Sequence, residues 1–131
     1  MRERKVTPTN LLTLSVKEVI QLISERVLSD IPEGINSHDD LRIVEERLGR
    51  LANDYAYVME LLSYSRTYVR TLKRQGQKEA YEDMMDKRSA LEDIASAVKM
   101  QYQAVSRMLT AEIQIRDEND MYEYRKARGY Q

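Results

Sequence analysis

The sequence contains no cysteine, no phenylalanine and no tryptophan. A chain without cysteine has neither a disulfide framework nor a thiolate metal site, which fits a reducing cytoplasm. The bulky contacts must come from nine tyrosines and seven methionines, and both residue types suit surfaces that are partly hydrated or that adapt to a partner. This composition is compatible with an oligomer.

Long hydrophobic runs are absent as well, so no transmembrane helix is expected, and the basic start of the chain is not followed by a signal-peptide core. Charged residues make up 33% of the chain, but the formal net charge is only -1. No overall field therefore attracts nucleic acid or a membrane surface, and any such binding must be local. We expect a cytoplasmic protein with no membrane partner.

Glycine and proline are scarce, and the segment from Ser37 to Lys73 contains only Gly49 as a weak helix former. This segment follows a heptad repeat in which nine of the ten seam positions are apolar. A helix over it is about 54 Å long, too long for an isolated surface helix, so the rest of the chain must pack against it. The seam positions are Leu41, Val44, Leu48, Leu51, Tyr55, Val58, Leu62, Ser65, Val69 and Leu72.

A second long helix is predicted over residues 78–116, because no glycine or proline interrupts this segment. The first long helix, over residues 37–75, ends with Lys73 and Arg74 in its last turn and Gly76 as a left-handed C-cap. Since the two helices are similar in length and few residues join them, they should form an antiparallel, coiled-coil-like hairpin. The apolar stripe of the second helix is Tyr81, Met84, Leu91, Ala95, Val98, Tyr102, Val105, Leu109 and Ile113.

The segment before the hairpin completes an all-α chain with a single domain over residues 1–131. Residues 1–14 are predicted to form a flexible arm. Ser15 and Glu18 form a capping box that opens an N-terminal helix over residues 15–29. Pro32 and Gly34 then mark a short connection to the hairpin.

The two outer ends of the hairpin carry polar signals. Ser37 is expected to cap the first long helix, with Asp39 and Asp40 in its first turn. The polar run from Asp117 to Asp120 is expected to interrupt the second. Residues 117–131 are therefore predicted to be a polar and basic tail, in which a short C-terminal helix is possible.

Apolar residues away from the seam form a second stripe, which the two helices of one hairpin cannot fully cover. Four of them recur on the first long helix at spacings of four, three and four, and three more broaden the face of the second. We expect the N-terminal helix and neighbouring copies to cover this stripe; the alternative is that its tyrosines lie at the surface. The stripe comprises Tyr57, Leu61, Tyr64, Tyr68, Ile94, Met108 and Ile115, of which Tyr57, Leu61, Tyr64, Met108 and Ile115 form the predicted oligomer or partner interface.

The sequence carries no catalytic signature. His38 is the only histidine, and a lone histidine beside a helix cap is usually structural. A nucleophilic triad needs a base beside the nucleophile, and the sequence offers no second histidine for this role. The four glycines are too scattered to form a phosphate-binding loop. We therefore predict that the protein is not an enzyme and needs no cofactor.

Paired acids are the remaining candidates for chemistry, since helical bundles can bind Mg²⁺ between facing helices. All-α nucleotide pyrophosphohydrolases use two adjacent glutamates and a third acid three residues later, but here Glu45 and Glu46 are followed by Gly49. We predict no metal site. A Mg²⁺-dependent hydrolase would instead lose its turnover when Glu82 or Asp86 is replaced by alanine.

The strongest local signal is electrostatic, because five basic residues and no acid lie between Arg66 and Lys78. Basic side chains interleaved with tyrosines can bind a phosphate backbone and stack unpaired bases. One chain would neutralise few phosphates, so several copies would have to present their patches together. The predicted nucleic-acid-binding residues are Arg66, Arg70, Lys73, Arg74, Lys78 and Tyr68.

A structural interpretation of the same residues stays open. Basic residues at a helix C-terminus are favoured by the macrodipole. They could also pair with Glu79, Glu82 and Asp83 just beyond the turn.

The hairpin, and especially the run YEDMMDKRSALEDIASAVKMQYQAVSRML from Tyr81 to Leu109, resembles small helical proteins encoded in phage genomes. Its size, helical pattern and basic hairpin are similar to those of phage recombination mediator proteins, over residues 38–116. The resemblance implies a ring-forming, non-enzymatic accessory protein of phage DNA recombination or replication in the host cytoplasm. Its partners would be further copies of itself, single-stranded DNA, a single-strand binding protein and the recombinase that it helps to load.

The alternative function is a protein-only interaction module, such as a virion assembly adaptor or an inhibitor of a host protein. In that case the tyrosine and methionine stripe is the interface, and the basic residues only solubilise the hairpin tip. Only the first function predicts a nucleic-acid affinity that falls steeply with salt.

Overall fold

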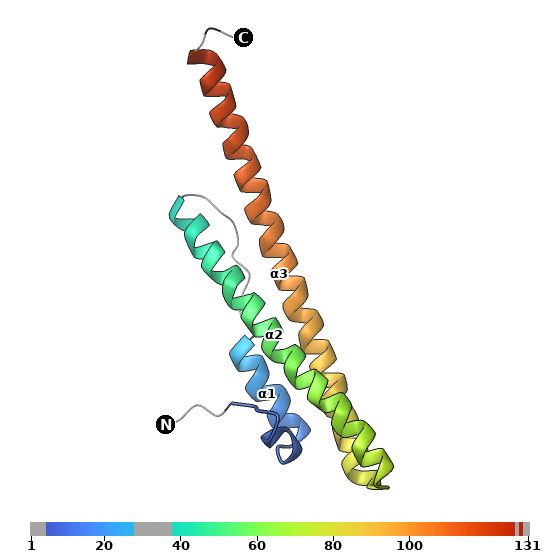
Figure 1. Ribbon diagram of the computed structural model, residues 1–131. Coiled ribbons are helices and arrows are strands. Elements are labelled where there is room, and N and C mark those ends of the chain that lie inside the picture. Colours follow the sequence, from blue (N-terminus) through green and yellow to red (C-terminus); the bar gives the residue numbers. More distant parts are fainter. Residues whose placement is uncertain (1–4, 28–37, 128, 130–131) are drawn as a thin grey trace, which may run out of the picture.

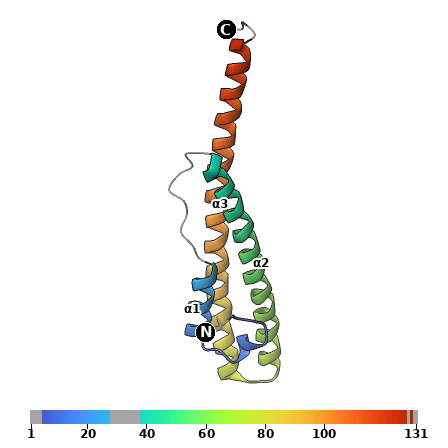
Figure 2. The same ribbon diagram turned by 90° about the vertical axis from the view of Figure 1, so that its left-hand side faces the viewer.

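The computed structural model describes residues 5–27, 38–127 and 129. Its elements are a short 3₁₀ helix, η1 (Asn10–Leu12), and the α-helices α1 (Val16–Val27), α2 (His38–Arg74) and α3 (Lys78–Ala127). Figures 1 and 2 show that α2 and α3 lie side by side as an antiparallel pair, and that α1 packs against this pair. No strand occurs in the described ranges. The predicted all-α helical hairpin is therefore confirmed.

The seam predicted on α2 is the line along which the two long helices pack. The hydroxyl of Ser65, its one polar member, donates to the carbonyl of Leu62 at 2.7 Å, so this buried group is satisfied within its own helix. On α3, Tyr102 and Ile113 differ from the prediction because they are 39% and 42% exposed. Val44, Leu51, Val58, Leu62, Ser65 and Val69 are buried, and Leu41, Leu48, Tyr55 and Leu72 are partly buried.

The turn between α2 and α3 is closed by the Gly76 cap that the sequence predicts. Gly76 has a φ of 70°, in the left-handed region that favours glycine. Its N–H donates to the carbonyl of Lys73, and the N–H of Gln77 donates to that of Leu72, both at 3.2 Å. This is the Schellman pattern, and it places the basic end of α2 next to the start of α3.

The prediction of a flexible arm is wrong for residues 5–14, which we call the N-terminal hook. Val6, Leu11 and Leu14 are buried. The side chain of Asn10 shapes the hook, because it accepts from the N–H of Thr7 at 2.6 Å and donates to the carbonyl of Lys5 at 2.8 Å. The hook has too few apolar residues to show a helical or strand period, so the sequence pattern predicts an unstructured arm.

The capping box at the start of α1 is confirmed. The N–H of Glu18 donates to Ser15 Oγ at 3.1 Å, and the N–H of Ser15 donates to Glu18 Oε1 at 3.2 Å. The predicted end of this helix near residue 29, the connection over residues 30–36 and the cap at Ser37 lie outside the described residues, as do the side chains of residues 38–40.

The prediction that the second long helix ends near residue 116 is wrong, because α3 continues without a break to Ala127. The polar run after Arg116 contains no glycine or proline, and polar residues are compatible with a solvated helix. An ion pair between Arg116 Nε and Glu112 Oε1, at 3.2 Å, supports the helix just before the expected boundary. As a result, α3 projects beyond the start of α2 (Figure 1). We call residues 114–127 the overhang.

Candidate nucleic-acid interface

One face of the hairpin is covered by the hook and α1. Three side chains of the hairpin donate hydrogen bonds to backbone carbonyls of the hook, and these bonds join residues that are far apart in the sequence. They run from Tyr57 Oη to the carbonyl of Val6, from Tyr68 Oη to that of Pro8 at 3.0 Å, and from Lys87 Nζ to that of Leu11 at 2.8 Å. The tyrosine stripe of α2 is therefore covered, at these positions, by the chain itself.

Lys87 is a buried charge that the sequence interpretation missed. Its side chain is fully buried between the hairpin and the hook, and its Nζ lies 2.7 Å from Oδ2 of Asp83, which is 45% exposed. A buried ammonium is tolerated when it is paired and hydrogen-bonded, and both conditions hold here. The signal was present in the sequence, because Lys87 lies on the apolar stripe between Met84 and Leu91.

The five residues of the predicted partner interface are divided between two environments. Leu61 is buried, and Tyr57 is partly buried beneath the hook. Tyr64 and Ile115 are 43% and 52% exposed, and Met108 is partly buried. The five side chains therefore do not form one open surface.

The environment of Tyr57 shows how the covered face is built. Lys5 Nζ lies 5.0 Å and Arg26 Cζ 5.7 Å from the centroid of its ring, within the range of cation–π contacts. Burial raises the pKa of the Tyr57 hydroxyl, although the charge of Arg26 lowers it. Burial also raises the pKa of Asp54, against the opposing charges of Arg50 and Arg26.

The basic patch predicted from the sequence lies at the closed tip of the hairpin. Arg70, Lys73, Arg74 and Lys78 are exposed, and the structure describes no ion pair for any of them within residues 5–27, 38–127 and 129. Asp83, one of the acids expected to neutralise them, pairs with Lys87 instead. We call these four residues the tip cations.

The other two residues of the predicted patch do not join the tip cations. Arg66 points across the hairpin, where its Nη2 lies 3.9 Å from Oε1 of Glu92. Tyr68 is partly buried, and its hydroxyl binds the hook. Tyr68 is therefore an anchor of the covered face.

The opposite face of the hairpin holds a groove between α2 and α3. Tyr55 and Arg66 come two residues before Tyr57 and Tyr68, and a step of two residues turns about 200° around a helix. Tyr55 and Arg66 therefore lie on the far side of α2 from the hook. They line this open groove together with residues of α3.

The groove and the tip contain three hollows, each of which combines a tyrosine with a basic residue. The first, of about 200 Å³, lies at the tip and is lined by Lys73, Lys78 and Tyr81. The second, of about 240 Å³, is lined by Tyr55, Arg66 and Lys99, and the third, of about 350 Å³, by Tyr55, Lys99 and Tyr102. Among the described residues that line these hollows, the one acid is Glu92, which is paired with Arg66 and with Arg88 Nε at 3.7 Å.

The residues Tyr55, Lys99 and Tyr102 were not predicted as site residues. Lys99 and Tyr102 are three apart and so share one side of a helix, which is visible in the sequence. That they line a hollow with Tyr55 depends on the register of the hairpin. The pattern of one helix does not fix this register.

The described residues contain no group of three or more histidine, cysteine or acidic side chains that could hold a metal ion. Asp83, which lies between Glu82 and Asp86 in the sequence, is paired with Lys87. None of the helices in the described ranges is both long enough and apolar enough to cross a membrane.

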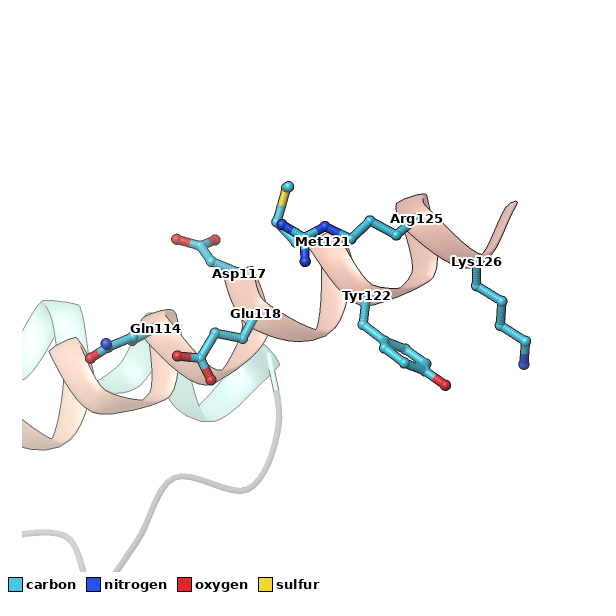
Figure 3. A pocket seen from close by; sticks show the side chains of 7 residues that line it. All are labelled: Gln114, Asp117, Glu118, Met121, Tyr122, Arg125 and Lys126. Carbon is cyan, nitrogen blue, oxygen red and sulfur yellow. The ribbon is translucent and has the colours of Figure 1, made fainter. Parts of the chain in front are cut away.

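The overhang presents a further surface on a single helix. Figure 3 shows its side chains along α3, with the start of α2 at the Gln114 end and no second element beside Met121, Tyr122, Arg125 and Lys126. This surface is therefore a helix face, not a cavity for a small molecule. Its residues are Gln114, Asp117, Glu118, Met121, Tyr122, Arg125 and Lys126.

Comparison of the chain with protein-family models, curated proteins and solved structures found no match. A proposal of DNA binding by this hairpin therefore depends on the geometry of the site.

Proposed function

We propose that this chain is a non-enzymatic accessory protein that binds single-stranded DNA along the open groove and the tip of its hairpin. The observation that carries the proposal is that each of the three hollows combines a tyrosine ring with a lysine or arginine. Non-specific single-strand binding uses this combination, because cations follow the phosphates while unpaired bases stack on aromatic rings.

The tip cations support the same proposal. Their side chains are exposed and have no described ion pair. A phosphate backbone could therefore bind these cations without first breaking an ion pair with a carboxylate. From Lys78 to Tyr102, α3 rises about 36 Å, which is long enough for several nucleotides. Tyr64 is 43% exposed, but its ring centroid lies 6.2 Å from that of Tyr68, so it belongs to the hook's side of α2 and not to the open groove.

The wider role follows from the resemblance to phage recombination mediators. The protein would act in the host cytoplasm and help to load a recombinase onto DNA that is coated by a single-strand binding protein. This role is tested by following recombinase filament assembly on coated single-stranded DNA. We expect assembly to be faster with the wild-type chain than with a variant that lacks the tip cations.

Direct binding is tested by anisotropy of a labelled single-stranded oligonucleotide with the variant Arg70→Glu/Arg74→Glu. We expect this change to abolish binding at moderate salt and to leave helicity unchanged, because both side chains are exposed. The matched control is Arg42→Glu/Arg50→Glu, which makes the same change in charge at two exposed positions nearer the other end of α2. Equal losses in the two variants would show a general effect of charge and contradict a site at the tip.

Stacking is tested with Tyr102→Ala. Loss of one aromatic platform should weaken single-strand binding by about 5-fold or more, from the 1–3 kcal/mol typical of one base on one ring. Binding of duplex DNA, whose bases are already stacked, should change little. A chain that binds no DNA at low salt would instead favour the protein-only interaction module.

A further inference from the structure

The overhang leaves apolar side chains in solvent. Met121, Tyr122 and Tyr124 are 51%, 65% and 54% exposed, and no other described element lies beside this end of α3 (Figures 1 and 2). Exposed large apolar residues that gather on one helix, as distinct from single scattered ones, mark a surface for a partner.

The charges around these residues form an ordered series. Two acids, Asp117 and Glu118, are followed four residues later by Met121 and Tyr122, and four residues after that come two bases, Arg125 and Lys126. A spacing of four keeps residues on one side of a helix. These six residues, which we call the overhang face, are therefore acidic at one end, apolar in the middle and basic at the other end (Figure 3).

The acids and bases of the overhang face cannot neutralise one another within one chain. Asp117 precedes Arg125 by eight residues, as Glu118 precedes Lys126, and this separation is about 12 Å along the helix axis. The structure describes no ion pair for these four side chains within residues 5–27, 38–127 and 129.

A second copy of the same face brings acids toward bases when it runs in the opposite direction. A two-fold axis between Met121 and Tyr122 places Glu118 opposite Arg125 of the second copy. Asp117 and Lys126 are nine residues apart, about 180° around the helix, so they lie at the two edges of this contact. The apolar residues then meet at the centre. In a parallel arrangement each charged residue would instead lie opposite the same residue of the second copy, and these like charges would repel each other.

We propose that two copies of this chain pair antiparallel through the overhang face. This inference goes beyond the proposed DNA binding and does not depend on it, because no tip or groove residue takes part. The interface is isologous, as is usual for two-fold dimers. It is also small, so the affinity should be in the micromolar range.

The charge pattern is tested by analytical ultracentrifugation at about 100 μM, a concentration chosen for such an affinity. We expect the wild-type chain to be a dimer. The variants Asp117→Lys/Glu118→Lys and Arg125→Glu/Lys126→Glu should each dimerise at least about tenfold more weakly, because all facing charges become alike. An equimolar mixture of the two variants should recover the dimer, since each supplies the charges that the other lacks.

The antiparallel direction of the two helices is tested by introducing single cysteines. Because the chain contains no cysteine, any disulfide must form at the introduced position. Met121→Cys lies next to the axis and should form a disulfide-linked dimer under mild oxidation. Gln114→Cys is the matched control, since in the antiparallel register its two copies lie about 22 Å apart along the axis and should stay reduced. Circular dichroism of each variant should match that of the wild-type chain.

The proposal is supported by a dimer that is lost in both charge variants, recovered in their mixture and crosslinked at position 121 only. A monomeric wild-type chain would overturn it, and would show that the charges only solvate the overhang and suit the helix macrodipole. Retention of the dimer in both charge variants, or crosslinking at position 114 as efficient as at position 121, would overturn it as well.

Discussion

Lys87 is the residue on which the covered face depends most directly. It is fully buried, and its Nζ binds both a carbonyl of the hook and the carboxylate of Asp83. An irregular segment such as the hook has backbone carbonyls without helical partners, and these groups need donors when they are buried. The two tyrosine hydroxyls of α2 act in the same way on Val6 and Pro8.

We expect Lys87→Met to lower the free energy of unfolding by about 1–3 kcal/mol, because the change leaves the carbonyl of Leu11 without a donor and Asp83 without a cation. Urea denaturation followed by circular dichroism measures this. Lys99→Met, an exposed lysine on the same helix, is the control and should stay within about 0.5 kcal/mol of the wild-type value. Equal effects of the two changes would contradict the anchoring role of Lys87.

At the scale of elements, the hairpin could be predicted from the sequence, but the packed hook and the helical overhang could not. The heptad positions of α2 and the glycine at residue 76 specify a seam and a turn locally, so both predictions are confirmed. The hook packs through three apolar side chains, which are too few to show a period, and through backbone carbonyls, which leave no pattern in the sequence. The sequence predicts a tail for the overhang because its polar run interrupts the seam, but a helix needs no seam where it has no partner beside it.

The two glycines of α2 and its turn should respond in opposite directions to alanine. Gly76→Ala should lower the free energy of unfolding by about 1–2 kcal/mol, because a side chain disfavours the φ of 70° at this position. Gly49→Ala should raise it by about 0.5–1 kcal/mol, because Gly49 is helical and a Cβ there meets no atom within 4 Å. Thermal or urea unfolding of both variants checks this, and the same sign of change in both would contradict the described turn.

The continuity of α3 is tested by Asn119→Pro, which lies in the polar run that suggests a break. Proline in a helix interior removes a hydrogen bond and costs about 3 kcal/mol. Because the overhang is exposed and separate from the core, we expect helicity to fall while the unfolding midpoint of the hairpin stays close to the wild-type value. Unchanged helicity would show that residues 117–127 are not helical in solution.

At the scale of the whole molecule, the candidate DNA site and the overhang face lie toward opposite ends of α3 (Figure 1). An antiparallel dimer would therefore hold its two tips about 130 Å apart, from the helical rise between Lys78 and the two-fold axis. Small-angle X-ray scattering of the dimer should give a maximum dimension of at least this size. A dimer no longer than a single α3 helix, about 75 Å, would contradict the end-to-end arrangement and favour tips that lie together.

The measurement that tests the central proposal most directly is the salt dependence of binding to a single-stranded oligonucleotide. The logarithm of the association constant should fall linearly with the logarithm of salt concentration, and in Arg70→Gln/Arg74→Gln the slope should be shallower by about 1.4, since each phosphate contact contributes about 0.7. Arg42→Gln/Arg50→Gln should keep the wild-type slope. No binding at low salt, or the same slope in all three proteins, would contradict a DNA site at the hairpin tip.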